Sequence, residues 1–240
     1  TGAIAGNDDA FNAFINYHGI ARVEIFETLI EIPNLFRKKK KSESKRVGIV
    51  ATTGGGGAMV VENLSGSDIE IVDPGLPIQK IMQDNNIPYN KNKLVDLTIA
   101  GTKPEIVTKV ISQMMQNKNC DLVVMVVGSS AKFRPEQAVE PLLKWANYPK
   151  PLAVYVAPDA PEALNLLHKN NIACFRTPES CAESVKTFLN TKNPVKPKIY
   201  ETDSINISKK LMKNSSKNLS EEEALEIFKD IGIEIVDYRV

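Results

Sequence analysis

The sequence predicts an α/β protein in which a parallel sheet is covered by helices on both faces. Short apolar runs alternate with helical stretches between residues 47 and 190, an order typical of parallel sheets. Residues 121–127 are nearly all apolar, as expected for a strand buried on both faces. The segment of roughly 145 residues also has the usual size of one such domain.

The first half of this segment begins with an expected strand over residues 46–51, an apolar run bounded by turn residues. Four glycines, Gly54–Gly57, follow it, and the apolar run 58–64 then begins a helix. The next strand is expected over 69–72. Residues 104–116 carry a helical stripe of apolar side chains, which Thr102 is expected to cap.

The second half repeats the alternation. A helix is expected after each strand because apolar spacing, proline and capping residues all mark helix starts. The expected strands are 121–127, 152–156 and 172–175, and the expected helices are 135–146, 161–169 and 177–190.

Two polar stretches divide the chain into parts. Residues 37–46 form a basic run without apolar side chains, typical of a solvated linker, and 191–217 is a second linker rich in Lys, Asn and Ser. A helical segment, 8–36, precedes the first linker. After the second, Ser220 and Glu223 form a capping box that opens a helix ending near Gly232, followed by a strand over 233–236.

Composition excludes several classes of protein. The 30 basic and 29 acidic residues give a net charge of +1, too balanced for a general nucleic-acid binder. No apolar run is long enough for a membrane span. Three cysteines fit a reducing cytosol rather than a disulfide framework, and their spacing predicts no zinc site. We therefore expect a cytoplasmic protein without a metal site on this chain.

The glycine loop is the first candidate site. Thr53 and Gly54–Gly57 lie between a strand and a helix, where free N–H groups and the helix dipole favour phosphate. No Lys-Ser or Lys-Thr follows the glycines, so the loop is not a Walker motif. Two alternatives stay open: a tight turn without a ligand, and NAD binding with Asp73 on the ribose.

A second loop, Gly128-Ser129-Ser130-Ala131-Lys132, follows the most apolar strand. Ligands of open parallel sheets bind beyond the carboxyl ends of the strands. Ser129 and Ser130 could donate hydrogen bonds there and Lys132 could supply charge, although serines are also ordinary turn residues.

Three stretches resemble NDP-forming acyl-CoA synthetases, the relatives of succinyl-CoA synthetase. The opening Thr1-Gly2-Ala3-Ile4-Ala5-Gly6-Asn7-Asp8 is similar to the segment directly after that family's active-site histidine, and Gly19-Ile20-Ala21-Arg22-Val23 follows it. The centre resembles the family's second flavodoxin-like domain through 46–50 with the glycine loop, 95–98 and 150–154. Residues 219–224 and 231–233 look like the start of its ATP-grasp domain.

The resemblance implies a domain order: 1–36 ends the first ligase domain, 37–46 is a linker, 47–190 is the flavodoxin-like domain, 191–217 is a second linker, and 218–240 begins the ATP-grasp domain. Such enzymes convert acyl-CoA, ADP and phosphate to acid, CoA and ATP with magnesium, through a phosphohistidine held by helix N-termini. Residues 53–57 and 128–130 would form one such cradle, and Thr1, Gly2 and Ala3 would be a remnant of the active-site loop.

The histidine of this family would precede Thr1, so we expect a fragment that is inactive alone and binds phosphate weakly. Its partners would be the CoA-binding and ATP-grasp domains, in one chain or in partner subunits, and a homo-oligomer is an option. One alternative is a non-catalytic regulatory module of an acetyltransferase-fused homologue. A nucleotide-binding module is the other.

Overall fold

The computed structural model describes residues 6–37, 44–89, 93–195 and 219–230, together with residues 233 and 235. It divides into two compact units, Thr1–Pro194 and Val195–Val240, and each is described by itself. No helix in the described part of the chain is long and apolar enough to cross a membrane.

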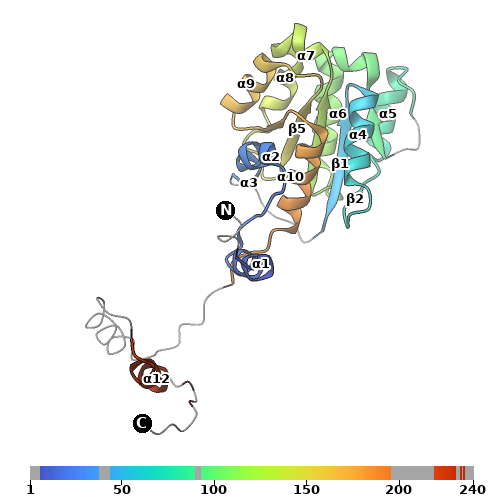
Figure 1. The fold of residues 1–240 in the computed structure, drawn as a ribbon. Coiled ribbons are helices and arrows are strands. Elements are labelled where there is room, and N and C mark those ends of the chain that lie inside the picture. The colour runs from blue at the N-terminus through green and yellow to red at the C-terminus, as the bar shows by residue number, and fades with distance from the viewer. Residues whose placement is uncertain are drawn as a thin grey trace. The chain divides into compact units, whose positions relative to one another are not determined.

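The first unit is built on a six-stranded, fully parallel sheet with the order β2-β1-β4-β5-β6, and β3 also pairs with β1 (Figure 1). β1 is the central strand, because β2 pairs with its first residues and β3 with its last three, while β4 pairs along its other side. The strands are Arg46–Ala51 (β1), Glu70–Ile71 (β2), Leu94–Asp96 (β3), Leu122–Val127 (β4), Leu152–Val156 (β5) and Ala173–Phe175 (β6).

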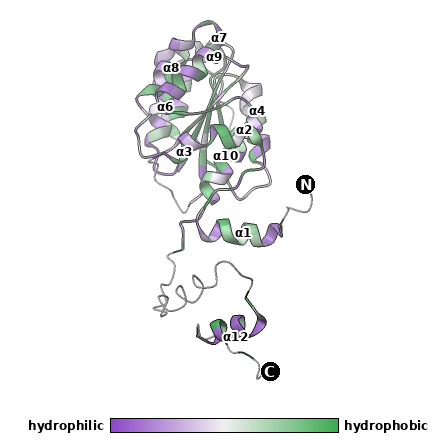
Figure 2. Ribbon diagram, turned by 60° about the vertical axis from the view of Figure 1, so that its left-hand side comes forward, coloured by the Kyte–Doolittle hydropathy of each residue, from purple (hydrophilic) through white to green (hydrophobic). Residues whose placement is uncertain are grey.

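Helices cover both faces of this sheet, and alternate residues of each strand point to opposite sides. Val123, Met125 and Val127 of β4 belong to the apolar core that also contains residues of α5, α6, α8 and α9. Leu122 and Val124 belong to the core on the other face, with residues of α3, α4 and α10. The strands are accordingly green, hydrophobic, along most of their length in Figure 2.

The bounds of the helices follow the predicted apolar stripes closely in the second half of the domain. They are Asp8–Tyr17 (α1), Phe26–Glu31 (α2), Pro33–Phe36 (α3), Gly54–Leu64 (α4), Leu76–Asp84 (α5), the 3-10 helix Thr98–Thr102 (η2), Pro104–Gln116 (α6), Ser130–Phe133 (α7), Pro135–Leu143 (α8), Pro161–Lys169 (α9), Pro178–Asn190 (α10) and Glu221–Asp230 (α12).

The N-terminal helices pack on the central domain. α2 and α3 contact β6 and α10, and Ile32 and Leu35 are buried in the α4/α10 core. The Glu183 carboxylate of α10 accepts hydrogen bonds from the backbone N–H groups of Glu24 and Ile25 at 2.6 and 3.2 Å. These groups lie at the start of α2, so a side chain of one helix caps the other.

Most expected elements are confirmed, and three details differ. α4 begins at Gly54, so the four glycines form its first turn instead of preceding it. Thr102 lies in η2, and the N-cap of α6 is Lys103, without a side-chain cap. No sequence pattern predicted α5, β3 as a separate strand, η2 or α7.

In the second unit, α12 begins with the predicted capping box. The backbone N–H of Ser220 donates to Glu223 Oε2 at 2.8 Å, and the N–H of Glu223 donates to Ser220 Oγ at 3.2 Å. The helix ends at Asp230, close to the end predicted near Gly232. Of the strand expected over 233–236, residues 234 and 236 lie outside the described residues, as do most of the two linkers, and residues 233 and 235 are not assigned to a strand.

Candidate functional site

The candidate site lies where the order of the sheet reverses. After β1 the chain passes to β2 and β3 on one side, and β4 then begins the other side with β5 and β6. In open parallel sheets the crevice at such a point, beyond the carboxyl ends of the strands, is the usual ligand site. The two loops singled out from the sequence follow β1 and β4, the two strands that flank the reversal.

Thr52 joins these two loops. Its backbone N–H donates to Val126 O at 2.9 Å, and its hydroxyl accepts a hydrogen bond from the N–H of Gly128 at 2.9 Å. Gly101 of η2 lies directly against Thr52, since a Cβ on Gly101 would stand 2.4 Å from Thr52 Cβ. Three segments distant in the sequence therefore meet at one threonine.

The first turn of α4 presents backbone donors at this crevice. Thr53 is the N-cap, in an extended conformation, and its side chain makes no capping hydrogen bond. Within the described part of the chain, nothing accepts from the N–H groups of Gly54, Gly55 or Gly56, whereas Gly57 N–H donates to Thr53 O at 3.0 Å. The positive end of the helix thus offers three donors, the arrangement that binds anions.

The glycines of this turn have different surroundings. A Cβ on Gly56 would lie 3.0 Å from side-chain atoms of Thr53 and Val126, and one on Gly57 would lie 2.9 Å from Ala51 Cβ. A Cβ on Gly55 would meet nothing within 4 Å. The turn packs on the strands through Gly56 and Gly57, so a ligand has access over Gly55.

Asp96, at the end of β3, bounds the site on one side, although no sequence pattern assigned it a role. Its Oδ1 accepts a hydrogen bond from Thr98 N–H at 2.9 Å, and its Oδ2 would lie 2.4 Å from a Cβ on Gly54. A side chain at position 54 would therefore displace this carboxylate, whose negative charge also repels anions from that direction. The signal available in the sequence was the position of Asp96 directly after the apolar residues Leu94 and Val95, at the end of a strand.

The second predicted loop borders a cleft of about 330 Å³. Gly128 is buried, Ser129 is exposed at the N-cap of α7, and Ser130 lines the cleft. The other lining residues come from η2, the end of α7, the residue that joins it to α8, and the first half of α8: Gly101, Thr102, Phe133, Arg134, Gln137 and Ala138. The structure thus brings together the predicted residues 53–57 and 128–130, whereas Thr1, Gly2 and Ala3 lie outside the described residues.

The described residues contain neither a cluster of metal ligands nor a cysteine with a lowered pKa. They contain no group of three or more His, Cys, Asp or Glu side chains that could hold a metal ion. Burial raises the pKa of Cys174 to about 11, and it raises the pKa values of Cys120 and Cys181 as well. These thiols are protonated at neutral pH and therefore weak nucleophiles.

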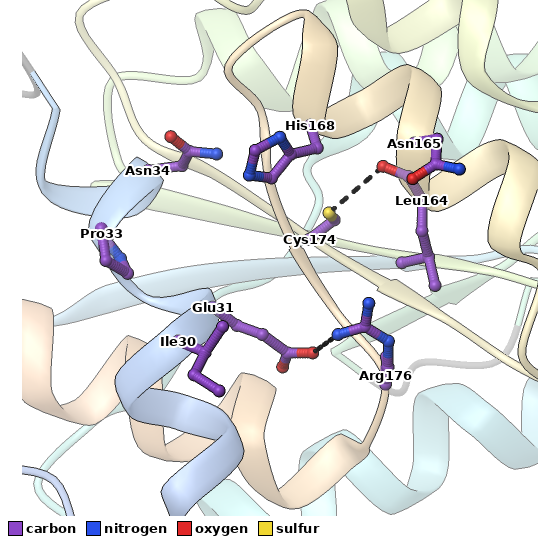
Figure 3. Close-up of a pocket in the computed structure, with 9 residues that line it drawn as sticks. All are labelled: Ile30, Glu31, Pro33, Asn34, Leu164, Asn165, His168, Cys174 and Arg176. Carbon is purple, nitrogen blue, oxygen red and sulfur yellow. Dashed lines mark hydrogen bonds and ion pairs between the residues drawn. The ribbon is translucent and has the colours of Figure 1, made fainter.

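A second cavity, of about 200 Å³, lies between the N-terminal helices and α9 (Figure 3). Glu31 and Arg176 face each other across its floor, joined by a hydrogen bond of 2.8 Å. The other Glu31 oxygen accepts from the buried Ser180 Oγ at 2.8 Å. Because both carboxylate oxygens have partners within the protein, we interpret this cavity as part of the junction between the N-terminal helices and the central domain.

The fold is shared with solved structures of larger proteins. PH0766 from Pyrococcus horikoshii OT3 matches with a TM-score of 0.65 at 18% identity, over 77% of this chain and 44% of that one. The dinucleotide forming acetyl-coenzyme A synthetase 1 of Ca. Korarchaeum cryptofilum, in complex with phosphate and ADP, matches with 0.63 at 19% identity, over 78% and 41%. Its apo form gives 0.61 at 20% identity, over 77% and 42%.

This chain therefore spans less than half the length of the structures it matches. Comparison of the sequence with protein-family models and with curated proteins finds no match. At this level of identity, the structural likeness shows the flavodoxin-like fold.

Proposed function

We propose that this chain is part of an ADP-forming acyl-CoA ligase and supplies one cradle for its phosphohistidine. The observation that carries the proposal is the first turn of α4, whose free N–H groups on Gly54, Gly55 and Gly56 open onto the sheet's reversal point. The shared fold with an acetyl-coenzyme A synthetase and the resemblance of the opening segment to the residues after the family histidine support the same function.

The proposed reaction divides between this chain and its partners. An acyl-CoA and phosphate give CoA and an acyl phosphate, the acyl phosphate transfers its phosphoryl group to histidine with release of the acid, and ADP accepts that group to form ATP. Donors fixed at a helix N-terminus stabilise the negative charge of the phosphoryl group during such transfers. In this proposal CoA, nucleotide and magnesium bind the partner domains.

The domain assignment is part of the proposal. Residues 1–36 would end the first ligase domain, 37–46 and 191–217 would be linkers, 47–190 would be the flavodoxin-like domain, and 218–240 would begin an ATP-grasp domain. The partner domains would belong to the same chain or to partner subunits in the cytoplasm. The docking of α2 and α3 on β6 and α10 supports a fixed junction between the first two parts.

Titration of the ¹⁵N-labelled chain with inorganic phosphate tests the cradle. We expect weak binding, with a dissociation constant of about 30–200 mM, because one helix N-terminus contributes only about 1–2 kcal/mol. The amide shifts should lie at residues 52–57 and 128–130. Gly55→Val should remove these shifts, since its side chain would cover the donors without meeting other atoms. Ala58→Val, at an exposed position of the same helix, is the matched control and should bind phosphate normally.

Shifts confined to residues 37–46 would mean that the basic linker binds anions, and the proposal would fail. The chain alone should also release no CoA from acetyl-CoA with ADP and phosphate. Turnover in that assay would contradict the assignment of the histidine to another part of the enzyme. Calorimetric binding of ATP or NAD would instead favour the nucleotide-binding alternative.

A further inference from the structure

α1 presents an aromatic face to solvent, made by Phe11, Phe14, Tyr17 and His18. The first three side chains are 55, 59 and 41% exposed, and their spacing places all four on one side of the helix. The opposite side carries the buried Ile15 and borders a cavity shared with the end of α10. Exposed apolar side chains gathered in this way mark a surface for interaction, and the described part of the chain leaves this one uncovered.

The rings of this aromatic face are already held in place. The Phe14 and His18 rings lie 4.5 Å apart between centroids, and the Tyr17 ring lies edge-on to that of His18 at 5.2 Å. The guanidinium of Arg22 lies over the Phe11 ring at 5.7 Å and forms an ion pair with the first turn of the helix at 2.8 Å. Side chains that are ordered before binding lose little conformational entropy on association, so the face can dock as it stands.

A second copy of this chain fits the aromatic face. Phe11 and Tyr17 lie three residues before and after Phe14, so a two-fold axis at Phe14 would bring Phe11 of each copy against Tyr17 of the other. This pairing is antiparallel, which opposes the two helix dipoles and keeps the acidic first turns apart. The four residues carry no permanent charge, and the net charge of the chain is only +1, so two copies can meet without strong repulsion.

We propose that two copies of this chain associate through the aromatic face of α1, with the two helices antiparallel about a two-fold axis at Phe14. The pairing uses no other domain of the proposed ligase. With Ile20, which follows the face and is 51% exposed, each copy would bury about 400 Å², because a fully buried aromatic side chain removes about 200 Å² from water. The total of about 800 Å² is below that of stable complexes, so we expect a weak, reversible dimer with a dissociation constant of about 0.1–1 mM.

Analytical ultracentrifugation of the full 240-residue chain tests the association. We expect the mean mass to rise from that of a monomer towards that of a dimer between about 20 µM and about 1 mM chain. Phe14→Glu should abolish this rise, because it places two carboxylates together at the axis. Phe14→Ala, which puts a strong helix former in α1, should weaken association by about tenfold or more. Leu29→Glu is the matched control: Leu29 is also 59% exposed but lies on α2, and this variant should associate normally.

Disulfide cross-linking tests the antiparallel arrangement. Ala10 and His18 lie four residues before and after Phe14, so each should face the other across the axis. Under mild oxidation a mixture of Ala10→Cys and His18→Cys chains should form linked dimers, whereas each variant alone should not, because Ala10 would lie about 12 Å along the helix from its counterpart. The unchanged chain measures any cross-linking by the three native cysteines. A monomer at every concentration, or a dimer that both Phe14 variants retain, would overturn the proposal, and equal cross-linking in the single-variant samples would overturn the antiparallel pairing.

Discussion

Removal of the Glu31 carboxylate should destabilise the docking of the N-terminal helices on the central domain. The Glu31 side chain is only 5% exposed, and its two oxygens accept hydrogen bonds from Arg176 Nη1 and Ser180 Oγ, both at 2.8 Å. The Glu31 carboxylate also lies beside the first turn of α10, which contains Ser180, and its negative charge complements the positive end of that helix.

The expected loss of stability follows from the groups that Glu31→Ala leaves without a partner. Ser180 Oγ is fully buried and would lose its partner, at a cost of about 1–3 kcal/mol. The helix end would lose a favourable carboxylate, about 0.3–1 kcal/mol. The side chain of Arg176 is 58% exposed and would return to water, so its ion pair contributes little. We expect a loss of about 2–3 kcal/mol in the free energy of unfolding.

Urea unfolding followed by the fluorescence of Trp145 measures this loss, because Trp145 is the only tryptophan and is buried in the central domain. Glu27→Ala is the matched control: it removes an exposed carboxylate from the same helix and should change stability by less than about 0.5 kcal/mol. An equally small effect of Glu31→Ala would refute the reasoning, since a partnered buried carboxylate cannot be removed at no cost.

Two further predictions concern the cores and the thiols. Leu35→Ala, at a fully buried position of α3, should lower the free energy of unfolding by about 2–5 kcal/mol. Leu29→Ala, at a 59% exposed position, should leave it nearly unchanged. Equal urea midpoints for the two variants would mean that α3 is not docked in solution. Because burial raises the thiol pKa values, the cysteines of the native chain should react slowly with a disulfide reagent at pH 8 and rapidly only in urea. A cysteine that reacts rapidly in the native chain would contradict this burial. The thiols concerned are Cys120, Cys174 and Cys181.

Local patterns predicted the elements whose stability depends on neighbours in the sequence. The apolar run of β4 indicated a strand buried on both faces, and all six of its residues are buried. Thr177 caps α10 through Ser180 N–H at 3.1 Å, and the capping box of α12 involves residues three positions apart. Such signals are readable because each is satisfied within a few residues along the chain.

The sequence by itself also placed two glycine- and serine-containing loops at the carboxyl ends of strands. Only the tertiary structure decided how they form a site. Thr52 joins loops that lie 76 positions apart, and Asp96 packs against Gly54. The buried partner of Glu31, Ser180, lies 149 positions away. Contacts of this kind depend on which strands become neighbours in the sheet, and no spacing along the chain encodes that order.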